Sequence, residues 1–260
     1  MPLPSDPIAV FDSGIGGISV LRHLRRLMPH ENYIYLGDSA HAPYGEKSAA
    51  QVRQLTFARV EELLERGAKA IVIACNTATS AAVAPLRSAH PDTVIIGIEP
   101  ALKPAAALRP GAVVLVMATP MTLREEKFQL LRERWCGDAR IIELPCYGLA
   151  EMIEKGMTEG PELHDYLSEL LQNVPRDEIT GVVLGCTHYP HVQESIASFF
   201  GPEVQFFDGG EGTARETHRR LQEAGLLNTG SAMGRVEILN TASREMADIC
   251  YRLLGDFDHA

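Results

Sequence analysis

The sequence predicts an α/β fold made of two similar lobes, each a parallel sheet covered by helices, with the active site in the cleft between them. Short apolar runs rich in Val and Ile alternate with helical patterns over most of the 260 residues. Alternation of this kind is typical of parallel sheets with helices on both faces. The pattern also repeats once along the chain, as expected if two lobes are related by a pseudo-twofold axis.

Nine apolar runs are strand candidates, because β-branched residues bounded by turn residues suit a buried strand. They cover residues 8–11, 33–36, 70–74, 93–98, 113–117, 140–144, 181–185, 204–207 and 235–239. The longest helix candidate spans residues 46–66, capped near Glu46 and ended by Gly67. After the run 70–74, Asn76 or Thr77 is expected to cap the next helix.

The repeat predicts how the chain divides. Residues 8 and 113, which open the two blocks, are 105 positions apart, and Cys75 and Cys186, which each follow a strand, are 111 apart. The turn-rich segment 97–112 would join the blocks. We expect one lobe from residues 1–99 plus 208–260, with the last segment returning to it, and the other lobe from residues 100–207. Cys75 and Cys186 would then face each other across the cleft.

Composition is that of an ordinary globular protein, with 45% hydrophobic and 22% charged residues. The net charge of −10 argues against a nucleic-acid partner, so a small anion must be held by local donors. Five widely spaced cysteines argue against a secreted disulfide framework. No signal-peptide pattern and no apolar run of about 18 residues is present, so we expect a cytoplasmic protein without a membrane partner.

Two loops carry candidate ligand-facing residues. FDSGIGG (11–17) has glycines that permit a tight turn and close approach to a ligand, but Ser19 breaks the dinucleotide fingerprint. Here Asp12 is either a cap or a catalytic acid, and Ser13 could cap a helix. LGDSAHAPYGEKS (36–48) suits either an ordered ligand-facing loop or a plain surface turn before a helix.

CNTAT (75–79) and CTHYP (186–190) each place a cysteine directly after a buried strand. One such cysteine is expected to be an inert core residue, but two at matched positions indicate shared chemistry. A zinc site of Cys75, Cys186 and His188 lacks the usual Cys-x-x-Cys or His-x-x-x-His spacing, and a redox pair lacks Cys-x-x-Cys. A Cys–His hydrolase stays open, although residues two positions apart in such a loop need not meet and Cys75 is left unexplained.

Two thiols on opposite faces of one carbon atom can invert its configuration. One thiolate removes a proton while the other thiol delivers one from the far side. Asp12, Glu154 or His188 could tune the thiols or carry their protons. The sequence has no Walker-type phosphate loop and no clear lysine site for pyridoxal phosphate, so we expect no cofactor and no metal.

Five motifs occur in order over roughly residues 8–215, namely FDSGIGG, LGDSAHAPYG, IACNTATS, MATPMT and LGCTHYP. Together they resemble the glutamate racemase family, cofactor-independent enzymes that supply D-glutamate for bacterial peptidoglycan. The resemblance implies that Cys75 deprotonates D-glutamate and that Cys186 deprotonates L-glutamate. It implies that Asp12 assists Cys75 and that His188 assists Cys186. Family members usually form homodimers.

A looser motif at residues 146–156 matches Glu154 to a further assisting carboxylate, with Glu151 as a nearby rival. The family often has Pro where Tyr147 stands. The resemblance also implies substrate contacts through hydroxyl, amide and backbone groups, which would let an acidic chain hold a dicarboxylate. These contacts match Asp12, Ser13, Pro43, Tyr44, Gly45, Asn76, Thr77, Thr119, Thr122, Thr187 and His188. We interpret the remaining cysteines as structural, namely Cys136, Cys146 and Cys250.

An aspartate or hydantoin racemase would share the fold and the paired cysteines, but DSGIGG and PYG favour glutamate. The other competing classes are the Cys–His hydrolase and a non-catalytic amino-acid-binding module. A hydrolase predicts a trappable acyl-enzyme, whereas exchange of the substrate α-proton with solvent would exclude the binding module.

Overall fold

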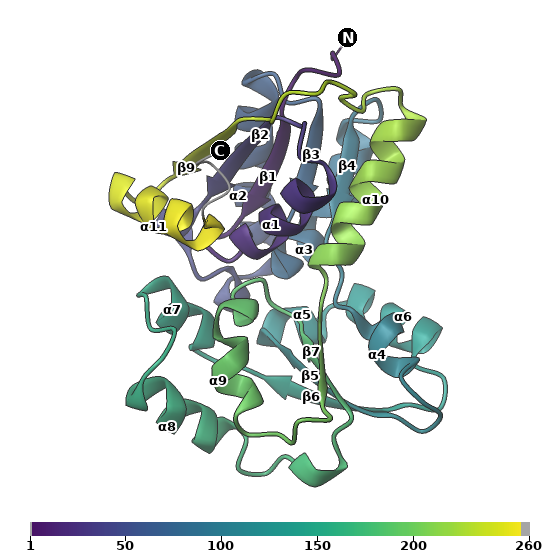
Figure 1. Cartoon of the computed structure of the whole chain (residues 1–260), viewed down its shortest axis with the longest axis vertical. Helices are drawn as coiled ribbons and strands as arrows, with labels where there is room; N and C mark the ends of the chain where they lie inside the picture. Colours follow the sequence, from purple (N-terminus) through teal and green to yellow (C-terminus); the bar gives the residue numbers. More distant parts are fainter. Residues whose placement is uncertain (1, 256–260) are drawn as a thin grey trace.

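A computed structural model describes residues 2–255 and contains two parallel sheets, one in each lobe (Figure 1). All nine predicted strands are present, and each end lies within one residue of its predicted position. The strands of the first sheet are β1 (Ile8–Asp12), β2 (Tyr33–Gly37), β3 (Ala70–Ile73), β4 (Val94–Gly97) and β9 (Val236–Asn240). Those of the second sheet are β5 (Val113–Ala118), β6 (Arg140–Pro145), β7 (Gly181–Leu184) and β8 (Gln205–Asp208).

The two sheets share one strand order. The first sheet runs β4-β3-β1-β2-β9 and the second runs β6-β5-β7-β8, with every pair parallel. The order β2-β1-β3-β4 therefore recurs as β6-β5-β7-β8, and β9 extends the first sheet beside β2. This repeat confirms the prediction of two similar parallel-sheet lobes, while the residue boundaries of the lobes stay a prediction.

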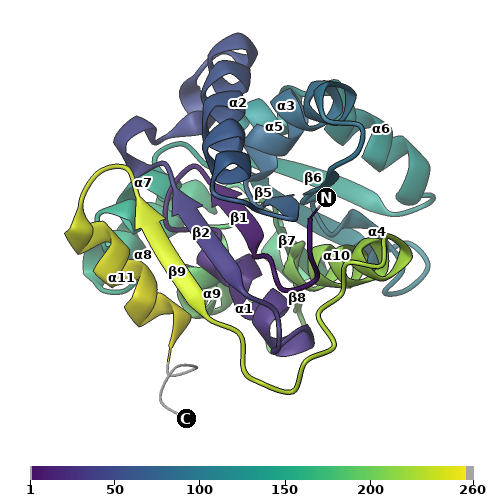
Figure 2. The ribbon, with the colours of Figure 1, turned by 90° about the horizontal axis from the view of Figure 1, so that it is seen from above.

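The helices cover both faces of the first sheet (Figure 2). On one face lie α1 (Ile18–Leu27), α10 (Gly210–Glu223) and α11 (Arg244–Leu254), and on the other lie α2 (Ala49–Glu65) and α3 (Asn76–Ala89). Successive residues of β1 accordingly enter different cores, as expected for a strand buried on both faces: Ile8 and Val10 pack under α1, and Ala9 and Phe11 under α2. The other α-helices are α4 (Leu102–Ala106), α5 (Pro120–Arg124), α6 (Glu126–Trp135), α7 (Leu149–Glu154), α8 (Pro161–Leu170) and α9 (Gln193–Ala197).

Two helix starts differ from the prediction. Helix α3 begins at Asn76, and its N-cap is Cys75, whose Sγ accepts the N–H of Ala78 over 3.4 Å. The prediction that Asn76 or Thr77 would cap α3 was wrong, because both residues already lie in its first turn. Helix α2 starts two residues after Lys47 and has a capping box formed by Ser48 rather than a cap near Glu46.

All five cysteines are free and buried. Within residues 2–255, no helix has both the length and the apolar composition needed to cross a membrane.

Candidate active site

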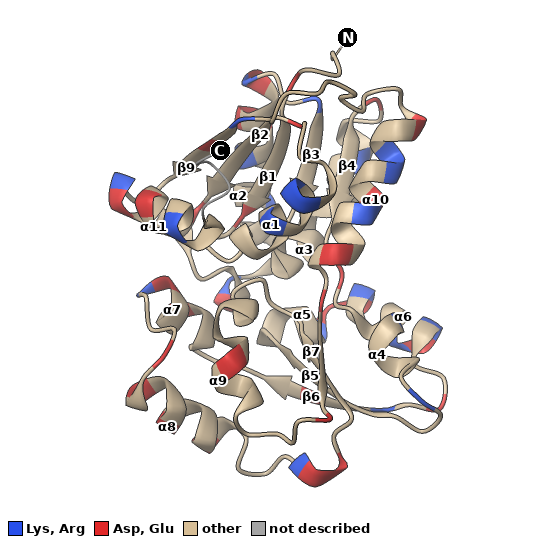
Figure 3. Cartoon of the chain, viewed as in Figure 1, with Lys and Arg blue, Asp and Glu red and all other residues tan. Residues whose placement is uncertain are grey.

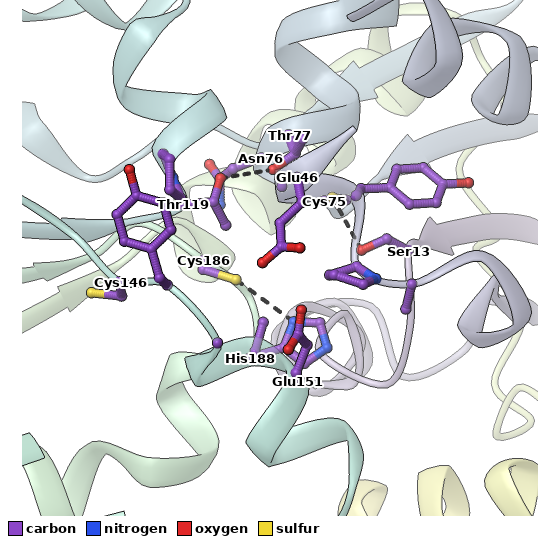
Figure 4. Close-up of a pocket in the computed structure, with 18 of the residues that line it drawn as sticks. Ser13, Glu46, Cys75, Asn76, Thr77, Thr119, Cys146, Glu151, Cys186 and His188 are labelled. Atoms are coloured by element: carbon purple, nitrogen blue, oxygen red, sulfur yellow. Dashed lines mark hydrogen bonds between the residues drawn. The ribbon is translucent and has the colours of Figure 1, made fainter. Parts of the chain in front are cut away.

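A cleft lies between the lobes (Figure 4), and its empty volume is about 570 Å³, including the part that opens to solvent. Both lobes line it, because the carboxyl ends of parallel strands in each sheet open toward it. The lining residues are Ser13, Ala42, Pro43, Tyr44, Gly45, Glu46, Cys75, Asn76, Thr77, Thr119, Pro120, Cys146, Tyr147, Gly148, Ala150, Glu151, Glu154, Gly185, Cys186 and His188. None of these is Lys or Arg, and in Figure 3 basic residues lie on outer helices such as α1 and α10.

The first half of the site is built around Cys75, which is 5% exposed at the end of β3. Its thiol donates to Oγ of Ser13 over 3.4 Å, and its sulfur accepts from the first turn of α3. Burial and the nearby carboxylate of Asp12 raise the pKa of Cys75 to about 12. The Cys75 thiol therefore keeps its proton at neutral pH.

Asp12 ends β1 and is fully buried behind Cys75. Its carboxylate accepts from the N–H of Gly14 over 2.8 Å and from Oγ1 of Thr187, in the other lobe, over 2.9 Å. Burial raises the pKa of Asp12 above its ordinary value, although the charge of His188 opposes the shift. Asp12 and Thr187 thus join the lobes beneath the cleft and do not line it.

The second half of the site is built around Cys186, which is 8% exposed in the loop after β7. Its Sγ lies 3.6 Å from Nδ1 of His188, and Nε2 of His188 lies 2.6 Å from Oε1 of Glu154. Cys186 and His188 therefore do meet, contrary to the doubt raised by their two-residue spacing. The reason is that His188 stands in a tight turn, which directs its ring back toward the sulfur.

Glu154 at the end of α7 is held from both lobes. Its Oε1 also accepts the N–H of Ile15 over 2.6 Å, and its Oε2 accepts Oγ of Ser39 over 3.0 Å. Although burial opposes it, the hydrogen bond and charge of His188 hold the pKa of Glu154 below its ordinary value. Burial likewise opposes the charge on His188, but hydrogen bonds to Cys186 and Glu154 raise the pKa of His188 well above its ordinary value.

The contact with His188 distinguishes Glu154 from its rival. Glu151 lies one turn earlier on α7 and lines the cleft near Glu46 of the other lobe. Burial and Glu46 raise the pKa of Glu151 above its ordinary value. Of these two carboxylates, Glu154 is the one that lies within hydrogen-bond distance of His188.

Two glycines of FDSGIGG make room for the opposite lobe. A Cβ atom on Gly14 would overlap the carboxylate of Glu154, and one on Gly16 would overlap the ring and backbone of His188. The close approach that these glycines allow is therefore to the side chains of Glu154 and His188 in the other lobe.

The remaining predicted contacts occupy different depths. Ser13, Pro43, Tyr44, Gly45, Asn76, Thr77 and Thr119 line the cleft. Thr122 lies behind it and bonds to the hydroxyls of Thr77 and Thr119, at 3.3 and 2.9 Å, so this cluster also joins the lobes. The hydroxyl of Tyr44 points to Asp38 rather than to the cleft.

Several residues of the cleft are absent from the contacts predicted from the sequence. Glu46 and Tyr147 line it, and so does Cys146, for which the sequence indicates only a structural role. Their positions inside recognised motifs were a signal for the first two. Among residues 2–255, no three His, Cys, Asp or Glu side chains group closely enough to hold a metal ion.

Comparison with known proteins places the chain in a family. Residues 18–217 match the model of the Asp/Glu/Hydantoin racemase family. The glutamate racemase of Clostridium acetobutylicum is 47% identical over 98% of this chain and 99% of its own.

Solved structures agree. Glutamate racemase from Thermus thermophilus, in complex with beta-chloro-D-alanine, is 36% identical with a TM-score of 0.80, covering 98% of this chain and 94% of that one. Glutamate racemase from Francisella tularensis, in complex with D-glutamate, is 30% identical with a TM-score of 0.83, covering 97% and 94%. With two thiols in one interlobe cleft and matches over most of its length, this chain belongs to the Asp/Glu/hydantoin racemase family.

Proposed function

We propose that the protein is a glutamate racemase, which interconverts L- and D-glutamate by two-base proton transfer at the α-carbon. One observation carries the proposal: two buried thiols from matched positions of the two lobes line a single cleft, Cys75 in contact with Ser13 and Cys186 in contact with His188. The family resemblance assigns the product to peptidoglycan synthesis.

In the first step, the Cys186 half accepts a proton. Nδ1 of His188 lies 3.6 Å from Sγ of Cys186, and Glu154 holds the other ring nitrogen, so the imidazole is placed to take the thiol proton and let the sulfur act as a base in the thiolate form. This thiolate removes the α-proton of L-glutamate. The bond from carbon to hydrogen breaks, a bond from sulfur to hydrogen forms, and the electron pair stays on the substrate.

In the second step, the Cys75 half delivers a proton. Its thiol is protonated, because burial and Asp12 raise the pKa of Cys75 to about 12. Transfer of that proton to the opposite face of the α-carbon gives D-glutamate and leaves Cys75 as a thiolate. The reverse reaction begins from this state: the Cys75 thiolate removes the α-proton of D-glutamate, and the Cys186 thiol delivers a proton to the opposite face.

Donors without positive charge would hold the substrate. The N-terminus of α3 offers backbone N–H groups and the side chains of Asn76 and Thr77, and Thr119 faces them from the other lobe. The named substrate of the related enzymes and the D-glutamate complex of the Francisella enzyme favour a dicarboxylic amino acid here.

The test is incubation with L-glutamate in deuterated water without added cofactor or metal. We expect the circular dichroism signal to decay to zero and deuterium to appear at the α-carbon of the D-product by mass spectrometry. The same assay with L-aspartate is the comparison. Faster decay of the signal with aspartate than with glutamate would make aspartate the proposed substrate, and no decay with either amino acid would refute racemisation.

We further propose that the protein works in the cytoplasm as a homodimer. Five free cysteines suit a reducing compartment, and the homodimer follows from the family resemblance alone. Light scattering coupled to size-exclusion chromatography tests the second part, because a single 28.4 kDa species would contradict it.

A further inference from the structure

A chain of hydrogen bonds runs from the edge of the first lobe into the Cys186 half of the site. Nδ2 of Asn240, at the end of β9, donates to Oγ of Ser39 over 2.9 Å, and Oγ of Ser39 donates to Oε2 of Glu154 over 3.0 Å. Glu154 in turn holds His188, which contacts Cys186. Ser39 and Asn240 do not line the cleft, and neither takes part in the proposed proton transfers.

The direction of these bonds is fixed by their surroundings. Oδ1 of Asn240 accepts the N–H of Ala242 over 2.9 Å, so the amide must present Nδ2 to Ser39. The Ser39 oxygen then accepts from Asn240, and its single O–H is left to point at Glu154. Because Glu154 accepts three hydrogen bonds on two oxygens, it is bound as an ionised carboxylate.

The grip on Glu154 comes from the lobe that does not contain it. Ile15 holds Oε1 from the loop after β1, and Ser39 holds Oε2 from a short 3-10 helix after β2 (Ser39–His41), both in the first lobe. Glu154 and His188 belong to the second lobe. The Glu154 side chain is 13% exposed in this arrangement. Its aim at His188 therefore depends on the two lobes being together.

We propose that Ser39, oriented by Asn240, is a positioning residue that aims the Glu154 carboxylate at His188 and so makes Cys186 competent for proton transfer when the lobes are closed. This deepens the proposed racemase function and rests on it. Asn240 acts only through Ser39, so its loss should matter less.

Other ionisable groups also face this chain. Asp12, Cys186 and His191 surround His188, and Tyr35 and Cys250 approach Glu154. None of them bonds to Ser39 among the described contacts. A change confined to Ser39 therefore leaves their charges in place, and a shifted pH profile reports on the lost hydroxyl.

The test compares Ser39→Ala, Ser39→Thr and Asn240→Ala with Ser88→Ala, a control on the exposed side of α3. We expect kcat/KM to fall about tenfold in Ser39→Ala and about threefold in Asn240→Ala. Ser39→Thr keeps the hydroxyl and should retain the wild-type rate. Because the Ser39 hydroxyl lowers the pKa of Glu154, its loss should raise that pKa and lower the pKa of His188. In the pH profile of kcat/KM, the acidic limb should therefore move to higher pH with the pKa of Glu154, and the alkaline limb should move to lower pH with the pKa of His188.

Isotope effects separate the two halves of the site. In Ser39→Ala, α-deuterated L-glutamate should show a larger isotope effect on kcat/KM than in wild type, because Cys186 removes that deuteron. The effect with α-deuterated D-glutamate, whose deuteron goes to Cys75, should not rise. A lower rate with both pH limbs and both isotope effects unchanged would mean that Ser39 only packs, and would overturn the proposal.

Alkylation keeps the test independent of turnover. Failure of the wild-type protein to racemise glutamate or aspartate would refute the proposed function. Ser39 would then be judged by iodoacetamide labelling followed by peptide mapping, with unchanged melting temperatures as the check on folding. We expect slower labelling of Cys186 in Ser39→Ala than in wild type and Ser88→Ala, with Cys75 unaffected. Equal labelling of Cys186 would overturn the positioning role.

Discussion

The two halves of the cleft place their thiols alike but surround them with different charges. Cys75 has a hydroxyl and a helix N–H as partners and the Asp12 carboxylate nearby. Cys186 has an imidazole at 3.6 Å, backed by the carboxylate of Glu154. The backbone repeat therefore extends to the strand order and to the position of each sulfur, but not to the electrostatics.

This difference gives each thiol different neighbours for proton transfer. Burial and the adjacent anion oppose ionisation of Cys75. On the other face, His188 lies beside Cys186, and although burial opposes it, hydrogen bonds to Cys186 and Glu154 raise the pKa of His188 well above its ordinary value. Cys186 therefore has a proton-exchanging neighbour that Cys75 lacks.

Loss of either thiol should have the largest effect. Cys75→Ser and Cys186→Ser should each lower racemisation by about 10³-fold or more, because a serine hydroxyl cannot replace the thiolate as a base. The halves should remain separable by NMR in deuterated water. Cys75→Ser should still exchange the α-proton of L-glutamate slowly, and Cys186→Ser that of D-glutamate.

Cys136→Ser is the matched control, because that thiol is buried in the core of the second lobe away from the cleft. Full racemisation by either active-site variant would contradict two-base chemistry. Exchange of the same enantiomer by both variants would contradict the assignment of one thiol to each face.

Removing the charge behind His188 should come next. Glu154→Gln keeps the shape of the side chain but not the charge that supports the imidazolium, so we expect kcat/KM to fall about 10²-fold. The pKa of His188 should also fall, which moves the alkaline limb of the pH profile to lower pH. Glu151→Gln, on the same helix, should cost less than tenfold and leave that limb in place. Similar losses of kcat/KM in both variants would mean that any change on α7 impairs the protein, and would contradict a specific role for the Glu154 charge.

Gly14→Ala tests whether the glycine loop serves the Cys186 half. The new Cβ would overlap the Glu154 carboxylate, which must then move away from His188. We expect about a 30-fold loss of kcat/KM, since small displacements of catalytic groups are costly. Gly212→Ala, which meets open space on α10, should be silent. An active Gly14→Ala enzyme would show that Glu154 can shift without consequence.

Local pattern was sufficient to predict the strands and the paired cysteines. A buried strand such as β3 is a contiguous apolar run, and the polar residues after Cys75 mark its end. The strand and the cysteine that follows it can therefore both be recognised within about ten residues of sequence. The repeat in β7 and Cys186 then predicted a second lobe. These predictions needed no knowledge of how the lobes meet.

Features that depend on contact between the lobes were not predictable in the same way. The bond from Ile15 to Glu154 joins residues 139 positions apart, and no periodicity distinguishes Glu154 from Glu151. The N-cap at Cys75 was not predicted because cysteine is not among the residues that usually cap helices. Its extended backbone conformation directs the sulfur toward the N–H of Ala78, and the sequence alone does not reveal that conformation.

A smaller effect than those of the active-site variants above is expected when the charge beside Cys75 is removed. Asp12→Asn removes the anion that opposes ionisation, so the pKa of Cys75 should fall from about 12. Iodoacetamide labelling of Cys75 at pH 8.5 should become about fivefold faster, while labelling of Cys186 stays the same. Peptide mapping after a timed quench measures both sites in one sample. An unchanged rate at Cys75 would mean that burial alone protects its proton. The contrast between the halves would then lie only in what His188 and Glu154 supply to Cys186.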